Sequence, residues 1–185
     1  DDTLVVSSIT TASTATIEVF APNAAVTSAV NVVSGRPGVI AINSQGDFAF
    51  GSDLTAAHLM DANSLTINAT LTGMNNPSSL GYNSDDTLYI ISRGAKLVNV
   101  FNVGSTTRDV TVPLGVEPVQ LAVAANGDVF TANYSANSVS RIPSGSLTAE
   151  TAITGINGAH GITTTSNGLV YVSSVISPVI FTVAE

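Results

Sequence analysis

The chain has 185 residues and a net charge of −8, and only 10% of its residues are charged, whereas soluble proteins typically contain about 25%. Its five Lys and Arg residues are too few and too scattered to neutralise a nucleic-acid backbone or an anionic membrane surface, so neither partner is expected. The absence of Cys excludes disulfides, thiolate catalysis and thiolate metal sites.

Apolar residues make up 44% of the chain, enough for a packed core. No stretch reaches the roughly 18 consecutive apolar residues of a membrane-spanning helix, so no membrane insertion is expected. Ser, Thr, Asn and Ala take the place of charged residues, and this composition favours an extracellular or cell-surface location, with the periplasm also open.

The chain opens with "DDTLVVSS" (1–8), which closely matches "DDTLYIIS" (85–92). In the later copy, this stretch is a turn followed by an apolar strand. The match predicts that the chain starts inside a repeat unit, at its second strand. Two further strands are expected, at 15–22 and 26–35.

Four longer segments then align with one another. They begin at residues 36, 76, 117 and 158, and read "RPGVIAINSQGDFAFGSD", "NPSSLGYNSDDTLYIISR", "EPVQLAVAANGDVFTANY" and "GAHGITTTSNGLVYVSSV". Pro37, Pro77, Pro118 and Ala159 mark the same position in each, about 40 residues apart. The sequence therefore predicts repeats at about 1–35, 36–75, 76–116, 117–157 and 158–185.

Each repeat follows one pattern. A short apolar strand after the Pro is followed by a tight turn such as "ANGD", whose Asn, Gly and Asp tolerate the positive φ angles of hairpin turns. A second apolar strand, a more variable third strand and a Thr-rich fourth strand complete the unit. Four short antiparallel strands per unit of about 40 residues are typical of a β-propeller blade.

We therefore expect an all-β fold without significant helix, a single β-propeller domain or part of a larger one. It should have about five blades, of which three are complete and the two terminal ones incomplete. Three outcomes are open for the ends: closure into an irregular five-bladed ring, membership of a larger propeller, or open edges filled by another copy of the chain. The blade faces should bury Phe48, Phe50, Leu88, Ile90, Phe130, Val170 and Val172.

The Pro–strand–"NGD"–strand pattern resembles the NHL/YVTN family of β-propeller repeats over nearly the whole chain. The second strands "YIIS", "FTAN" and "YVSS" depart from the full YVTN signature. The resemblance implies the propeller fold and leaves the function open among surface-layer proteins, protein- or sugar-binding modules, and lactonase- or lyase-type enzymes.

His160, in "GAHGIT", is a candidate acid or base because it stands at the start of an innermost strand, which lines the central channel of a propeller. The segment is similar to the channel segments of lyase-type propellers, in which a histidine serves as acid or base. Glu117 lies just before another innermost strand and is the second channel candidate. His58 is expected on the surface of a sheet.

No metal site or cofactor is expected, because no pattern of metal-ligand spacing occurs. The acidic stretch "NSDD" (83–86) reads as a hairpin turn, and Asp47 and Asp128 occupy one turn position in two repeats. The sequons at Asn68 and Asn133 are candidate glycosylation sites.

Two functions remain open. The first is a non-enzymatic propeller, acting as a binding or self-assembling surface protein, whose partner is another protein or further copies of the chain joined through the incomplete blades. The alternative is a lactonase- or lyase-type enzyme that uses the channel histidine.

Overall fold

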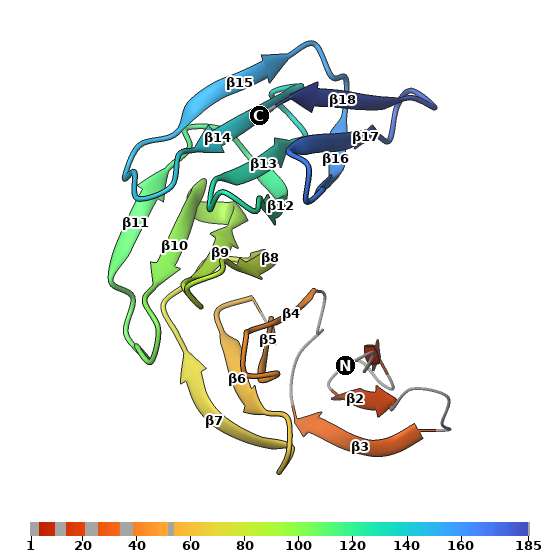
Figure 1. Ribbon diagram of the computed structural model, residues 1–185, viewed down its shortest axis with the longest axis vertical. Coiled ribbons are helices and arrows are strands. Elements are labelled where there is room, and N and C mark those ends of the chain that lie inside the picture. The colour runs from red at the N-terminus through yellow and green to blue at the C-terminus, as the bar shows by residue number, and fades with distance from the viewer. Residues whose placement is uncertain (1–3, 10–13, 21–25, 34–38, 52–53, 185) are drawn as a thin grey trace.

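The computed structural model is an all-β chain of five antiparallel sheets arranged in an arc (Figure 1). The structure describes residues 4–9, 14–20, 26–33, 39–51 and 54–184. Pro37 and Gly38, which the sequence places at the start of an innermost strand, lie outside the described residues.

Each sheet is formed by strands that are consecutive in the chain. The first contains β1 (Leu4–Ile9), β2 (Thr14–Phe20) and β3 (Val26–Val33). The second contains β4 (Ile40–Ile42), β5 (Phe48–Gly51), β6 (Ala57–Asp61) and β7 (Thr66–Leu71). The third contains β8 (Pro77–Tyr82), β9 (Leu88–Ser92), β10 (Leu97–Phe101) and β11 (Val110–Pro113). The fourth contains β12 (Pro118–Val123), β13 (Val129–Asn133), β14 (Ser138–Ile142) and β15 (Glu150–Thr154). The fifth contains β16 (Ala159–Thr164), β17 (Leu169–Ser174) and β18 (Ile180–Ala184).

Three four-stranded sheets between two three-stranded ones confirm the expected propeller blades. Arg93–Ala95 form a single turn of 3-10 helix between β9 and β10, and no described residue is in an α-helix. The first and last sheets stand at the two ends of the arc, and the arc does not close into a five-bladed ring (Figure 1). No helix of the described chain has the length and apolar character needed to cross a bilayer.

The turn between the first two strands of the second, third, fourth and fifth blades has the chemistry expected from sequence. In the fourth blade Gly127 has a φ of +88° and its N–H donates to the carbonyl of Ala124 at 2.9 Å. Glycine adopts this left-handed conformation without the steric cost that a Cβ atom would bring. The "NGD" signal therefore identified a real hairpin turn.

The innermost strands β8, β12 and β16 share one irregularity. Each shifts register against its neighbour near its first residues, between Pro77 and Leu80, Pro118 and Gln120, and Ala159 and Ile162 respectively. Such bulges re-aim side chains next to functional sites. Figure 1 shows these strands on the concave side of the arc, with β7, β11 and β15 on its outer rim.

The core lies between the blades. Along β9, Leu88 and Ile90 pack toward the second sheet, whereas Tyr89 and Ile91 pack toward the fourth. Both faces of a second strand are thus covered, which explains why these strands are apolar without alternation. All the core residues expected from sequence are buried: Phe48, Phe50, Leu88, Ile90, Phe130, Val170 and Val172.

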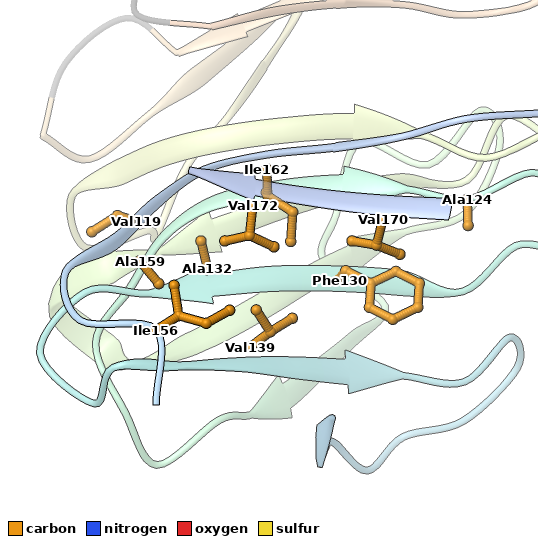
Figure 2. Close-up of a cluster of buried hydrophobic side chains, with 10 residues drawn as sticks. All are labelled: Val119, Ala124, Phe130, Ala132, Val139, Ile156, Ala159, Ile162, Val170 and Val172. Carbon is orange, nitrogen blue, oxygen red and sulfur yellow. The ribbon is translucent and has the colours of Figure 1, made fainter. Parts of the chain in front are cut away.

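Figure 2 shows one such interface. Val170 and Val172 on β17 lie against Phe130 and Ala132 on β13, with Val139 completing the layer. Fully burying a large apolar side chain contributes about 1.5–3 kcal/mol. The repeated interface therefore holds the blades at fixed angles and positions the ends of the innermost strands.

Candidate functional site

The candidate site lies where the innermost strands begin. Glu117 directly precedes β12 and His160 is the second residue of β16. These two strands pack against each other in neighbouring blades, and their last residues are in contact, since Thr164 Oγ1 donates to the carbonyl of Val123 at 2.9 Å. Their starts therefore lie on one face of the arc.

His160 falls inside the β16 bulge, where Ala159 pairs with Ser174 and the next paired residue is Ile162. Its side chain is exposed, and the backbone N–H of the following Gly161 donates to Ser173 Oγ at 3.1 Å. Within the described chain, no side chain forms a hydrogen bond or ion pair with the imidazole. An exposed imidazole at this position is accessible to a ligand and has the chemistry of a general acid or base.

Glu117 is held in a network of its own. Its Oε2 accepts a hydrogen bond from Ser135 Oγ at 2.6 Å, and its Oε1 accepts one from Arg93 Nε at 2.6 Å, with Arg93 Nη2 in the same ion pair. The hydrogen bond from Ser135 and the bond and charge of Arg93 lower the pKa of Glu117. Glu117 is therefore a fixed carboxylate that connects the third and fourth blades.

His160 and Glu117 are not hydrogen-bonded to each other in the part of the chain that the structure describes. The structure brings both residues to the same face without forming an acid–base pair. The partner that sequence reasoning missed is Arg93, which lies 24 residues before Glu117. Its side chain is 39% exposed beside Glu117.

Ser78 occupies in β8 the position of His160 in β16. Its Oγ is buried and has no hydrogen-bond partner among the described residues. Buried polar atoms are usually paired. The third blade thus presents an unsatisfied hydroxyl at the same point of its innermost strand.

The remaining candidates have structural partners. His58 Nδ1 lies 2.8 Å from Thr70 Oγ1, and its ring packs against Phe50 with centroids 5.4 Å apart. In the "NSDD" turn, Asn83 Oδ1 accepts the backbone N–H groups of Asp85 at 3.0 Å and Thr87 at 2.9 Å. Both arrangements anchor local structure.

The two sequons differ in accessibility. Asn68 on β7 is exposed. Asn133 is completely buried, and its amide donates to Ser138 Oγ at 3.2 Å and Ser140 Oγ at 2.9 Å. In the folded chain, Asn68 is therefore accessible to a glycosylating enzyme, whereas Asn133 is not.

Within the described ranges, no three His, Asp or Glu side chains gather closely enough to hold a metal ion.

Residues 49–167 match the sequence profile of the family described as lactonase, 7-bladed beta-propeller. The chain belongs to this family. The match covers more than half of the chain. It includes the second blade without β4 and all of the third and fourth blades, together with Glu117 and His160. A search of curated proteins found no significant match.

Solved structures show the same fold. The hydrazine synthase of Kuenenia stuttgartiensis superposes with a TM-score of 0.72 at 15% identity, covering 80% of this chain and 46% of that one. The virginiamycin B lyase of Staphylococcus aureus superposes with a TM-score of 0.70 at 14% identity, covering 86% of this chain and 56% of that one. The chain thus spans about half the length of the structures it matches.

Proposed function

We propose that the protein is a lactonase- or lyase-type propeller enzyme that opens a cyclic ester on the face where the innermost strands begin. The observation that carries the proposal is the exposed imidazole of His160 in the bulge of β16, inside the segment that matches the lactonase family. The NHL/YVTN-like repeat pattern is consistent with it, because that group includes enzymes of both types.

The chemistry needs one group that moves a proton. In hydrolysis, His160 takes a proton from water while the water oxygen adds to the lactone carbonyl. Collapse of the adduct breaks the ring C–O bond, and the imidazolium returns the proton to the ring oxygen, which leaves a hydroxy acid. In an elimination, His160 takes a proton from the carbon next to the one that carries the ring oxygen, the C–H electron pair forms a C=C bond, and the alkyl C–O bond breaks. The carboxylate that leaves takes the proton back from the imidazolium, so the product is one chain with a C=C bond and a carboxylic acid.

Arg93 supplies positive charge on the same face. Glu117 binds Nε and Nη2 of the guanidinium, and Nη1, which has no hydrogen-bond partner among the described residues, can donate to an oxygen that gains negative charge. Glu117 is assigned as the residue that positions Arg93, because its lowered pKa keeps it ionised and both its oxygens are occupied.

The test is turnover of a panel of γ-, δ- and macrocyclic lactones by the purified chain, followed by acid release in a pH-stat and by mass spectrometry. Hydrolysis adds one water to the substrate mass and elimination leaves it unchanged. We expect turnover, and a loss of at least about 100-fold in His160→Gln, the size typical of a general acid–base group. His58→Gln is the matched control, because His58 lies on a third strand. Equal rates for His160→Gln and the unmodified chain, or no turnover of any lactone, would contradict the proposal.

A second function, self-assembly at a cell surface, rests on a different observation. Ile180 on β18 is 66% exposed, although the equivalent residues Val139 and Val98 in the two preceding blades are 1% and 0% exposed. The strand registers make them equivalent: Ile180 pairs with Ser173, Val139 with Ala132 and Val98 with Ile91. A core position of the repeat is therefore open to solvent on the fifth sheet.

Another copy of the chain is the partner proposed for this surface, and the low-charge composition supports an extracellular or cell-surface setting. Light scattering of the unmodified chain and of Ile180→Lys tests it. Assembly that Ile180→Lys abolishes is the expected result, with exposed Val103→Lys as the control. A monomer at all concentrations would exclude this function.

A further inference from the structure

A cavity of about 170 Å³ lies between the second and third blades, at the edge where the turns after β4 and β8 and the loop after β10 meet. It is on the opposite face from His160, because it lies at the far ends of the innermost strands. Its lining combines polar and apolar groups, among them Asp47, Leu59, Asn68, Tyr82, Asp86 and Phe101.

Asp47 in this cavity has a structural counterpart in the fourth blade, Asp128. The carbonyl of Asp47 accepts the N–H of Asn43 at 2.9 Å, and that of Asp128 accepts the N–H of Ala124 at 2.8 Å. The carboxylates are bound alike too. Asp47 Oδ1 accepts the N–H of Ala62 at 3.0 Å, and Asp128 Oδ1 accepts that of Ser144 at 2.7 Å.

The two carboxylates differ in what faces their second oxygen. Asp128 Oδ2 accepts hydrogen bonds from Arg141, with Nε at 2.7 Å and Nη2 at 2.6 Å. The strand pairing places Leu59 where the fourth blade has Arg141, since Leu59 pairs with Ala49 and Arg141 with Phe130. Among the described residues, no Lys or Arg forms an ion pair with Asp47.

The arginine's second partner is also missing in the second blade. Arg141 pairs across the sheet with Glu150 and bonds to its Oε1 at 3.1 Å, whereas Leu59 pairs with Ala69. The shorter side chains leave open the volume that the guanidinium fills in the fourth blade. The cavity is thus the position of a missing guanidinium next to the carboxylate that would bind it.

The third blade adds further polar groups to the same cavity. Asp86 accepts the backbone N–H of Ser44 at 2.7 Å and the Ser44 hydroxyl at 2.5 Å. Burial, followed by the charges of Asp86 and Asp47, raises the pKa of Tyr82 to about 12. The phenol is therefore protonated at neutral pH and lies within the field of both carboxylates. Leu59, Leu88 and Phe101 form apolar walls beside them.

We propose that this cavity binds a guanidinium or primary ammonium group carried on a short apolar chain, with Asp47 as its principal counter-ion. The cation takes the place that Arg141 holds in the fourth blade, and its apolar chain lies along Leu59 and Phe101. The ligand is either a small free amine or guanidine, or the side chain of a Lys or Arg in a peptide. This inference does not depend on the lactone chemistry of the opposite face.

The next cavity along the arc provides an internal comparison. It has a volume of about 310 Å³ and lies between the third and fourth blades. Thr87 there stands at the position of Asp47, and Val100, which pairs with Tyr89, stands at that of Leu59. This second cavity contains the carboxylates of Asp85 and Asp109 but none at the position of Asp47, so the cation is not expected to bind there in the way that Arg141 binds Asp128.

The experiment is calorimetric titration of the purified chain with butylguanidinium and with butylurea, which has nearly the same shape and no charge, at physiological salt. We expect butylguanidinium to bind at least about tenfold more tightly. Asp47→Asn keeps an oxygen for Ala62 but removes the charge, and should weaken binding at least about tenfold. Asp85→Asn makes the same change in net charge in the neighbouring cavity and should leave binding unchanged.

Leu59→Arg gives a second, independent test. It supplies the missing guanidinium from within and should abolish butylguanidinium binding without lowering the melting temperature. A short peptide with one Arg and blocked ends distinguishes the sources: tighter binding than butylguanidinium indicates a protein side chain, and weaker binding a free small molecule. Equal binding of butylurea, undiminished binding by Asp47→Asn, or undiminished binding by folded Leu59→Arg would overturn the proposal.

Discussion

Arg141 and Asp128 form a two-point ion pair, in which Nε and Nη2 of the guanidinium meet the same carboxylate oxygen at 2.7 and 2.6 Å. The pair ties the third strand of the fourth blade to the turn that precedes its second strand, and Asp128 is nearly completely buried. A buried carboxylate needs such a partner, because an uncompensated charge in the interior is strongly destabilising.

The first prediction concerns this pair. Arg141→Leu removes the cation beside Asp128. It also places in the fourth blade the same residue type, Leu, that the second blade has at the equivalent position 59. We expect a lower melting temperature in calorimetry, and partial recovery in the double variant Asp128→Asn/Arg141→Leu, which removes the stranded charge. A double variant that is less stable than Arg141→Leu alone would contradict this explanation.

The second prediction compares packing with charge in the same blade. Phe130 is buried in the interface of Figure 2, and Phe130→Ala should cost about 3–5 kcal/mol because it leaves a cavity. Asp128→Asn retains an acceptor for Ser144 and should cost less, about 1–3 kcal/mol. Urea denaturation of the two variants side by side measures the order, and the reverse order would refute the blade alignment.

The third prediction uses two turn glycines with the same backbone conformation. Gly46 and Gly127 both have a φ of +88°. Gly46→Ala should cost about 1–2 kcal/mol for the left-handed conformation alone. Gly127→Ala should cost more, because its Cβ would lie 2.6 Å from Ser144 Oγ, whereas a Cβ at Gly46 meets no atom within 4 Å. Adding Ser144→Gly to Gly127→Ala should recover the excess; no recovery would show that the steric contact is not its source.

The fourth prediction concerns buried polar groups. Asn99 is completely buried; its amide donates to Ser92 Oγ at 2.7 Å and the carbonyl of Ile90 at 3.2 Å, and its oxygen accepts from Arg108 Nη1 at 3.1 Å. Asn99→Ala should destabilise the chain by about 1–3 kcal/mol, the usual cost of leaving a buried partner unsatisfied. Exposed Asn102→Ala is the control in the same urea titration. Equal midpoints for the two variants would disprove the role of Asn99.

The fifth prediction is a pH dependence. The pKa of Glu117 in the folded chain is lower than its ordinary value of 4.5. The carboxylate therefore stabilises the fold fully above about pH 4.5, and this contribution is lost as the pH falls through the lower folded-state value. Glu117→Gln should show a shallower loss of melting temperature in that acid range. Ser135→Ala should reproduce part of the effect, because the Ser135 hydrogen bond is the largest cause of the shift. If the melting temperatures of the unmodified chain and both variants fell equally with decreasing pH, this explanation would be contradicted.

Much of the fold could be predicted because its signals are local. The local signals are turn residues such as Gly127, the Pro at the first residue of β8 and of β12, and the apolar second strands, and each acts within a few residues. The same signals recur in each repeat unit, so a weak match to the pattern in one blade is supported by clearer matches in the others. The core residues followed directly, since both faces of a second strand are buried.

The site was less predictable because its contacts join different blades. Arg93 and Glu117 come from separate blades, and nothing in the sequence marks them as partners. The register shift that places His160 in a bulge is likewise a property of the paired strands. That no described Lys or Arg pairs with Asp47 became visible only when strand registers matched Leu59 with Arg141, since the spacing from the turn differs by one residue in the two blades.

The proposed enzymatic function requires that the His160 side chain faces the ligand. The chain has two histidines, so its imidazole NMR spectrum contains two sets of ring signals, and His58→Gln assigns them. We would titrate the protein with 2-piperidone, a cyclic amide that resembles a lactone and resists hydrolysis. We expect the His160 ring signals to shift until the site is saturated, while those of His58 stay in place. Unchanged His160 signals at saturating ligand would contradict the proposed enzymatic function.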